Sequence, residues 1–346
     1  MQTEITQGQK LLDSSGNIRN PGYAKKMVWD YRRSDIRVPR WRLKEWDYYY
    51  IGCDRYGLAL TVSNAGFASL LSVSFMNFDG RPSFRNDTEI RIPPSRSLIL
   101  PESSEEGTIS YRGDRAEILF ENDGKSRHLR GIFNKFDGGP ALTYDLCLTG
   151  IPEESMVIAT PFQKQGHFYY NQKINCMRVD GVVKLGMRRY PFRSDEGAMA
   201  TLDWGRGVWT YDNTWYWGSG QMLLEDGSPF GWNIGYGFGD CSMATENMLF
   251  FRGKAHKLKN VRFEIPKNQD GSFSYMEPWL FTEDDGRFEM KMIPLLDRTA
   301  PLDLKLISMV PHQVFGLYSG KAILDDGTEI RIKDRIAFAE HVRNKW

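Results

Sequence analysis

Hydrophobic and polar positions alternate most clearly between residues 201 and 239, where aromatic residues recur along two short segments. Residues 215–224 alternate and then become apolar, and Asp226-Gly227 follows at the position of a tight turn. Residues 230–238 carry glycine at every second position from Gly231, except where Asn233 intervenes. A period of two around an Asp-Gly turn predicts a strand, a turn and a strand, with rings on one face and closely approached backbone on the other.

The same pattern recurs along most of the chain and predicts an antiparallel all-β protein. Asp-Gly occurs eight times, at Asp79, Asp123, Asp137, Asp180, Asp226, Asp270, Asp285 and Asp326. This dipeptide supplies the positive φ angles of a hairpin turn, and strand-like runs flank most of these sites. The exception to the β pattern is an N-terminal arm, in which Pro21 opens an expected short helix from Tyr23 to about Arg32.

The length of 346 residues predicts two domains, or one large β domain, because single cores stop growing beyond roughly 250 residues. Polarity and turn residues rise together over residues 191–197, which are the best linker candidate. We therefore expect an arm over residues 1–34, a first β domain over 35–195 and a second over 196–346 that carries the tryptophan-rich segment. A long uncharged run, residues 58–78, contains polar residues and a turn, which favours two strands over a transmembrane helix.

Composition and charge indicate a folded, cytoplasmic protein with no nucleic-acid partner and no integral membrane segment. The net charge is +1, so no field gathers nucleic acid. The four cysteines lie far apart with no CxxC pair, which is typical of isolated thiols in a reducing compartment. Residues 1–10 are polar and show no apolar secretory segment.

We expect no cofactor and no metal, because the motifs that hold them are missing from the sequence. It has no Gly-rich phosphate loop with a lysine, no dinucleotide fingerprint, no HExxH motif and no serine nucleophile elbow. The five histidines are scattered singly. A lone histidine in a β protein is more often a hydrogen-bonded structural residue than a metal ligand.

Asp203 is the candidate catalytic residue, because it stands immediately before a dense group of rings. A carboxyl group beside indole rings loses hydration, which raises its pKa and lets it act as a general acid near neutral pH. The alternative is structural: Asp203 accepts backbone hydrogen bonds or pairs with Arg206.

Candidate ligand-binding residues surround Asp203 in sequence or share a strand with an aromatic face. They are Trp204, Trp209, Tyr211, Trp215, Trp217, Trp232, Asn233, His167 and Tyr169. The tryptophans also fit core packing, which is the commoner use of large rings. Bare backbone at the alternating glycines of residues 230–239 favours a ligand, because it leaves room for one.

Four segments carry a resemblance to a known family: NPGYAKKMVWDYRRSDI…RLKEWDYYYI, HFYYNQKINCM, LDWGRGVWTYDNTWYWGSG and FAEHVRNKW. With them the sequence resembles, over nearly its whole length, an uncharacterised bacterial family known as domain of unknown function 2804. More distantly, the order of features is similar to a two-domain lipocalin-like superfamily. That superfamily includes AttH-type proteins, carotenoid 1,2-hydratases (hydroxyneurosporene synthases) and tocopherol cyclases.

The wider resemblance rests on Asp203-Trp204-Gly205, Trp215-Tyr216-Trp217, Glu225-Asp226-Gly227 and a closing hairpin over residues 318–340. It implies an all-β fold of two lipocalin- or calycin-like antiparallel β-barrel domains, here with a short helical N-terminal arm. It also implies an apolar cavity and, as in the hydratases, an aspartate that protonates an isoprenoid double bond. That role would fall on Asp203.

These observations predict a protein that binds a hydrophobic small molecule, such as a lipid or isoprenoid, in a lipocalin-like barrel. Two alternatives stay open. One is a lyase (hydratase) or isomerase that acts on an unsaturated lipid, with Asp203 as general acid and Tyr211, Asp212 and His167 in support. The other is a carbohydrate-binding protein with an exposed platform of coplanar tryptophans.

Overall fold

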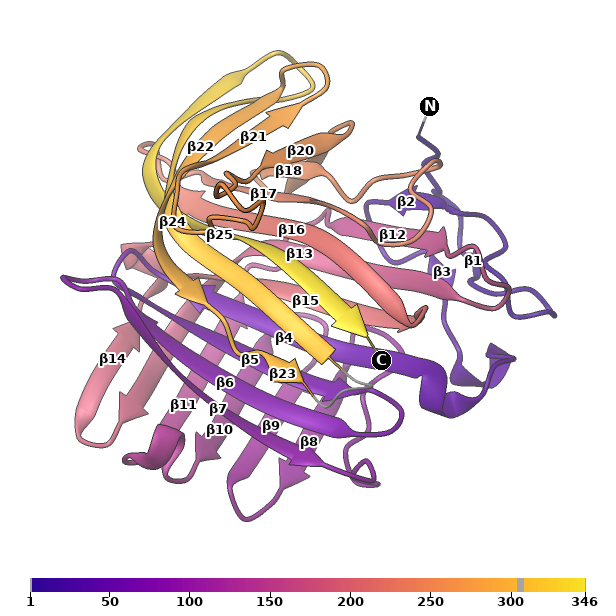
Figure 1. Ribbon diagram of the computed structural model, residues 1–346, viewed down its shortest axis with the longest axis horizontal. Coiled ribbons are helices and arrows are strands. Elements are labelled where there is room, and N and C mark those ends of the chain that lie inside the picture. The colour runs from indigo at the N-terminus through magenta and orange to yellow at the C-terminus, as the bar shows by residue number, and fades with distance from the viewer. Residues whose placement is uncertain (1, 304–307, 346) are drawn as a thin grey trace.

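Two curled antiparallel sheets lie one above the other and make up the protein (Figure 1). The computed structural model describes residues 2–303 and 308–345. Residues 1 and 346, the outer limits of the predicted domain ranges, lie outside that part. Strands dominate the described residues, and their helical segments are short 3-10 turns: η1 (Arg33–Asp35), η2 (Arg40–Arg42), η3 (Phe136–Gly138) and η4 (Ser194–Glu196). The predicted all-β class with two lipocalin-like β domains is confirmed.

The first sheet has thirteen strands, and a strand from later in the sequence enters its centre. In spatial order its main path is β7 (Ser83–Arg91), β6 (Ser69–Asn77), β5 (Tyr56–Asn64), β4 (Leu43–Gly52), β15 (Met199–Val208), β13 (Phe168–Leu185), β11 (Leu142–Thr149), β10 (Arg127–Phe133), β9 (Ala116–Asn122) and β8 (Gly107–Arg112). Off this path, β12 (Met156–Pro161) and β14 (Arg188–Phe192) pair with β13, and β2 (Gly22–Ala24) pairs with β12. The inserted strand is β15, whose Asp203 lies opposite Tyr48 on one side and Lys173 on the other.

The second sheet has ten strands and begins where the chain leaves β15. Its order is β19 (Lys254–Lys257), β18 (Met248–Phe251), β17 (Pro229–Tyr236), β16 (Asp212–Leu223), β25 (Glu329–Lys345), β24 (Ser308–Ile323), β22 (Phe288–Arg298), β21 (Trp279–Glu283) and β20 (Val261–Glu264), with β23 (Leu302–Asp303) beside β24. The predicted strand, turn and strand around Asp226-Gly227 are β16, its turn and β17.

The N-terminal arm contains short strands where the sequence predicts a helix, so that part of the prediction is wrong. Residues 22–24 form β2, and β3 (Trp29–Asp30) pairs with β1 (Gln9–Lys10) in a separate two-stranded sheet. Ala24 pairs with Val157 of β12, and Trp29 and Tyr31 are buried at a spacing of two. Edge pairing and burial of alternate rings therefore outweigh the weak local preference for helix.

Asp180-Gly181 does not form the predicted turn but lies inside β13. Gly181 pairs with Leu146 on one side and Phe192 on the other. A Cβ at this position would lie 2.2 Å from the carbonyl oxygen of Asp145. Glycine is required here by close approach of a neighbouring strand, which is its other common use in sheets.

The tryptophan-rich segment is divided between the two sheets, because the chain changes sheet between Val208 and Asp212. The boundary predicted from composition, between residues 195 and 196, falls in η4, which connects β14 and β15 of the first sheet. The predicted domain ranges stay a prediction, and the site described below depends only on which sheet each strand joins.

Three hydrophobic clusters follow from this arrangement: one inside each curled sheet and a third between them. Central strands contribute to two clusters at once, because successive side chains point to opposite faces. On β4, Tyr49 lies in the first core, whereas Tyr48 and Tyr50 lie in the third cluster. On β25, Ala339 lies in the second core and Phe338 in the third cluster.

The uncharged run at residues 58–78 forms the hairpin of β5 and β6, as predicted. In the described part of the chain, no helix has the length and apolar character needed to cross a membrane.

Candidate functional site

The third cluster contains charged side chains among its rings, and both domains contribute to it. Asp203 from β15 is almost fully buried there. Its Oδ2 atom lies 2.8 Å from Nζ of Lys173, whose side chain is 1% exposed. The Nδ2 group of Asn171 donates a hydrogen bond of 2.6 Å to Oδ1 of Asp203. The carboxyl group of Asp203 thus has a lysine and an amide as direct partners inside the protein.

Two further carboxyl groups reach this region from the second domain. Glu246 precedes β18, and its Oε2 atom accepts a hydrogen bond of 3.3 Å from the hydroxyl of Tyr169. Its Oε1 atom is buried without a hydrogen-bond partner. Glu340 on β25 accepts hydrogen bonds from the indole N–H of Trp215, at 2.9 Å, and from Nε2 of Gln313, at 3.2 Å.

Burial controls the protonation of these two glutamates. It raises the pKa of Glu246 from 4.5 to about 7, and the Asp203 charge acts in the same direction while Lys173 opposes it. Burial likewise raises the pKa of Glu340 to about 7, against the Trp215 hydrogen bond and the Lys173 charge. Desolvation penalises the ionised carboxylate, so near neutral pH both groups hold a proton part of the time. We call Asp203, Lys173, Glu246 and Glu340 the interdomain cluster.

Aromatic rings wall the interdomain cluster. The ammonium group of Lys173 lies 4.0 Å from the ring centroid of Trp217, a cation–π contact inside the protein. Trp217 also donates its indole N–H to Oδ1 of Asn233, at 2.7 Å. Trp209 and Trp215 meet edge to face with centroids 5.3 Å apart, and Tyr169 stacks on Phe238 at 4.9 Å.

Of the residues that the sequence singles out, Asp203, Tyr169, Trp209, Trp215, Trp217 and Asn233 are brought together here. The rings of Trp209 and Trp217 are 2% and 3% exposed, and they meet their neighbours edge-on. A carbohydrate platform needs exposed, coplanar rings, so these tryptophans do not form one.

The remaining predicted residues lie elsewhere. Trp204 lies in the first core and Trp232 in the second. Tyr211 is 44% exposed, just before β16. His167 is buried beside β13, where its Nδ1 atom lies 3.0 Å from the carbonyl oxygen of Gln165. Arg206, the alternative partner of Asp203, points to the other face of β15 and pairs with Asp47 at 3.0 Å.

Sequence reasoning missed Lys173, Glu246 and Glu340. Each is a lone charged residue in an otherwise uncharged stretch: YYNQKINCM, ATENMLFF and AFAEHV. Lys173 also lies on the same face of its strand as Tyr169 and Asn171, because the three residues are spaced two apart. This spacing could have been used to predict that Lys173 belongs to the site. Within the described residues, no three His, Cys, Asp or Glu side chains are grouped as a metal site requires.

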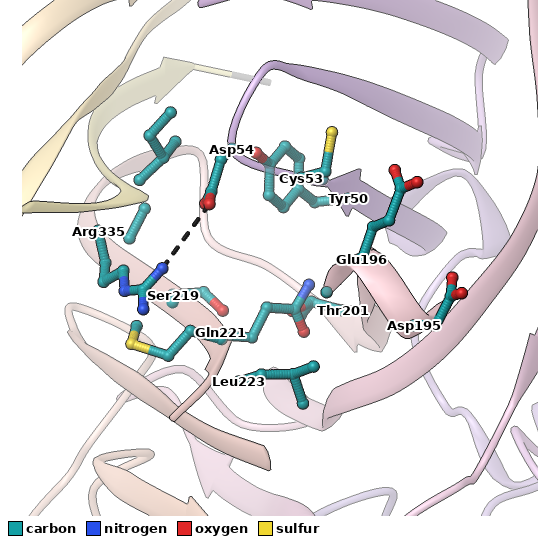
Figure 2. A pocket seen from close by; sticks show the side chains of 16 residues that line it. Tyr50, Cys53, Asp54, Asp195, Glu196, Thr201, Ser219, Gln221, Leu223 and Arg335 are labelled. Atoms are coloured by element: carbon teal, nitrogen blue, oxygen red, sulfur yellow. Dashed lines mark hydrogen bonds and ion pairs between the residues drawn. The ribbon is translucent and has the colours of Figure 1, made fainter. Parts of the chain in front are cut away.

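A cavity of about 300 Å³ lies between the domains (Figure 2). Thr201 of β15, Ser219 and Gln221 of β16, Tyr50 of β4 and Ile336 of β25 line it. On each of these strands, the same face carries a residue of the interdomain cluster or a ring that packs against it, two to four residues further along. These residues are Asp203 on β15, Trp217 on β16, Tyr48 on β4 and Phe338 on β25. Two residues of strand span about 7 Å, so the cavity and the interdomain cluster are adjacent.

Comparison with known proteins supports the fold. Kievitone hydratase from Nectria haematococca is similar, with a TM-score of 0.51 and 11% identity over 88% of both chains. CghA is similar, with a TM-score of 0.52 and 10% identity over 98% of this chain and 97% of that one. An AttH-like protein from Nitrosomonas europaea aligns over 87% of this chain and 92% of its own, with 14% identity and a TM-score of 0.47. At these identities the likeness to kievitone hydratase and CghA shows a shared fold and nothing about activity.

No curated protein matches the sequence. The family model described as domain of unknown function (DUF2804), however, matches residues 2–346, and the resemblance predicted from the four segments is thereby confirmed. This two-domain β protein belongs to the DUF2804 family.

Proposed function

We propose that the protein binds an unsaturated, largely apolar small molecule between its two β domains and transfers a proton to it, as a hydratase or isomerase. One observation carries the proposal: a lysine and three carboxyl groups are buried together among aromatic rings. Buried charges usually weaken a fold relative to apolar residues of the same size. Their presence among aromatic rings and next to a cavity is therefore more typical of a reaction site than of a structural one.

We propose Glu246 and Glu340 as the proton donors in place of Asp203, the acid that the sequence resemblance implies. A general acid works best when its pKa lies near the operating pH, and burial raises the pKa of both glutamates to about 7. Asp203 is held by Lys173 and Asn171 as an ion-pair partner. We assign Asp203 and Lys173 to fixing the charge of the site and the glutamates to donating the proton.

The proposed reaction adds a proton from a glutamic acid to one carbon of a double bond. For hydration, water adds to the other carbon and its released proton restores the carboxyl group, so the net change is one added water. For isomerisation, a neighbouring carbon loses a proton to the carboxylate, and nothing is added. The face of Trp217 already holds the Lys173 cation, so rings here are suited to stabilise developing positive charge. Kievitone hydratase, by its name a hydratase, has the same fold, which supports hydration on this architecture.

The test measures the transfer of deuterium from D₂O to a substrate. The purified protein is incubated with a metabolite extract of its own host, and mass spectrometry detects compounds that gain one water or one deuterium. We expect the wild type to label at least one compound and Glu246→Gln or Glu340→Gln to lose the labelling. Glu289→Gln, at an exposed ion pair with Lys321, is the matched control and keeps it.

The proposal is wrong if the wild type labels nothing, or if both glutamate variants label at the wild-type rate. A compound that remains bound in native mass spectrometry but is never labelled would leave binding alone as the function.

A further inference from the structure

The interdomain cavity beside the charged cluster contains a hydrogen-bond donor with a fixed direction. The Oε1 atom of Gln221 accepts hydrogen bonds from the backbone N–H of Cys176, at 2.9 Å, and from the hydroxyl of Thr201, at 3.0 Å. A backbone N–H can only donate, so the amide of Gln221 cannot be flipped without losing that bond. Its Nε2 group is buried and has no partner in the protein. Gln221 lines the cavity, and its unpaired N–H group lies just beneath the cavity wall (Figure 2).

A β-bulge at Cys176 fixes the direction in which the Gln221 amide points. Strand β13 carries a bulge between Ile174 and Met177, and Cys176 has a φ angle of 65°, in the left-handed region. Bulges re-aim side chains and backbone groups and are common beside functional sites. A Cβ at Gly231 would lie 2.8 Å from the sulfur of Cys176, so glycine makes room for the bulge.

A second donor lies beside the first. The Oγ atom of Ser219 accepts a hydrogen bond of 2.8 Å from Nδ2 of Asn175, the other residue of the bulge. The hydroxyl proton of Ser219 is then free to point into the cavity that this residue also lines. Two neighbouring donors are complementary to a single acceptor oxygen.

The charges at the wall indicate that this acceptor is neutral. Asp54, Asp195 and Glu196 line the cavity together with one cation, Arg335, which pairs with Asp54 at 3.7 Å across the two domains. Glu196 in turn pairs with Arg193 at 3.1 Å, so the cations Arg335 and Arg193 already have carboxylate partners. Paired cations attract an anionic ligand less than free ones do. Leu223, Ile336 and Tyr50 supply apolar surface for the remainder of a ligand.

We infer that the cavity recognises a neutral carbonyl or hydroxyl oxygen of the ligand through Gln221 and Ser219. This inference rests on the proposed function and narrows it: the substrate is an oxygenated, unsaturated apolar molecule that lies with its oxygen in the cavity and its double bond towards the glutamates. A volume of about 300 Å³ is at the small end of ligand sites, so the cavity accommodates part of such a molecule rather than a large one.

Four ten-carbon isoprenoids that differ mainly in their polar group serve as probes: citral, geraniol, geranic acid and myrcene. Binding is measured by quenching of tryptophan fluorescence. We expect citral and geraniol to bind on the order of tenfold more tightly than myrcene, the gain typical of a well-placed hydrogen bond, and geranic acid to bind more weakly than citral. Gln221→Leu is expected to reduce the affinity for citral to that for myrcene.

Gln221→Glu is the second variant, since it keeps acceptors for Cys176 and Thr201 but replaces the free donor by a carboxylate oxygen. It is expected to lose citral binding to the same extent, whereas Gln269→Leu, at an exposed position, keeps it. Equal binding of citral and myrcene by the wild type, no binding of any probe, or unchanged citral binding in both Gln221 variants would overturn the inference. The test measures affinity without turnover, so a failure of proton transfer does not affect its result.

Discussion

Replacement of Glu246 by glutamine tests the buried electrostatics directly and needs no knowledge of the ligand. Glutamine has the shape of glutamic acid and no charge, so Glu246→Gln imitates the protonated side chain at every pH. The hydroxyl of Tyr169 can rotate to keep its contact with either group, and Oε1 of Glu246 has no partner to lose. The substitution therefore removes the ionisation of Glu246 and changes few other interactions.

The magnitude follows from linkage between protonation and folding. The pKa of Glu246 is 4.5 without burial and about 7 in the folded protein, and one unit corresponds to about 1.4 kcal/mol. The folded state therefore binds more protons than the unfolded state between these two values, and stability falls as pH rises through that window. Above the upper value, the ionised carboxylate lowers the free energy of unfolding by about 3 kcal/mol. The glutamine variant does not bear this cost.

We expect Glu246→Gln to match the wild type at about pH 4.5 and to be more stable by about 3 kcal/mol at about pH 8.5. Urea unfolding followed by tryptophan fluorescence at both pH values measures the difference. Glu289→Gln, half exposed beside Lys321, is the control and shows no such pH-dependent gain. A variant less stable than the wild type at high pH, or a difference that does not change with pH, would refute the assignment of a raised pKa.

Two further predictions concern packing and charge in the same region. Lys173→Met leaves Asp203 buried without its cation and is expected to destabilise the fold by about 3–5 kcal/mol, whereas Lys321→Met at an exposed pair changes it by less than about 1 kcal/mol. Urea unfolding near neutral pH distinguishes them, and similar small effects for both would contradict burial of the pair. Gly205→Ala places a Cβ 2.1 Å from the indole of Trp46, and overpacking of this kind costs about 1–3 kcal/mol. Gly8→Ala, where the nearest atom is 4.0 Å away, is its control, and equal melting temperatures for the two variants would count against the packing described.

Local sequence patterns predicted the strands well because period two and Asp-Gly turns are local properties. The hairpin of β16 and β17 and that of β5 and β6 follow from this information alone. The arm was mispredicted because the pairing of β2 with β12 is set by residues more than a hundred positions away.

The residues of the candidate site that lie on one strand could be predicted from the sequence. Those that come together only through the pairing register of different strands could not. Tyr169 and Asn171 lie on one face of β13, and extending that face by two residues reaches Lys173. Glu340 is different: it comes beside Trp217 only because β25 pairs with β16 in a particular register. No local pattern encodes that register, so a lone glutamate in a strand looked like any solvent-facing charge.

Another buried charge cluster in the same protein offers a comparison for the proposed role of the interdomain cluster. Inside the first domain, Arg206 pairs with Asp47 at 3.0 Å and Arg33 pairs with Glu45 at 2.9 Å. There each carboxylate has its own guanidinium, as expected of charges that only hold strands together. Between the domains, Lys173 pairs with Asp203, whereas Glu246 and Glu340 form no direct ion pair within the described part of the chain. Lys257 and Arg298 act on these two glutamates only at longer range, and both glutamates have a pKa raised to about 7.

Carboxylates that each pair with a cation hold strands together but have no proton to give near neutral pH. Buried carboxyl groups without such a partner keep protons that they can transfer. Position strengthens the contrast. The paired cluster lies within one curled sheet, where Asp47 lines a pocket of only about 10 Å³. The interdomain cluster lies between two sheets, about two residues of strand from a cavity of about 300 Å³. A small separation of the domains would therefore admit a ligand. The proposed proton transfer requires both features, a proton held near neutral pH and an adjacent cavity.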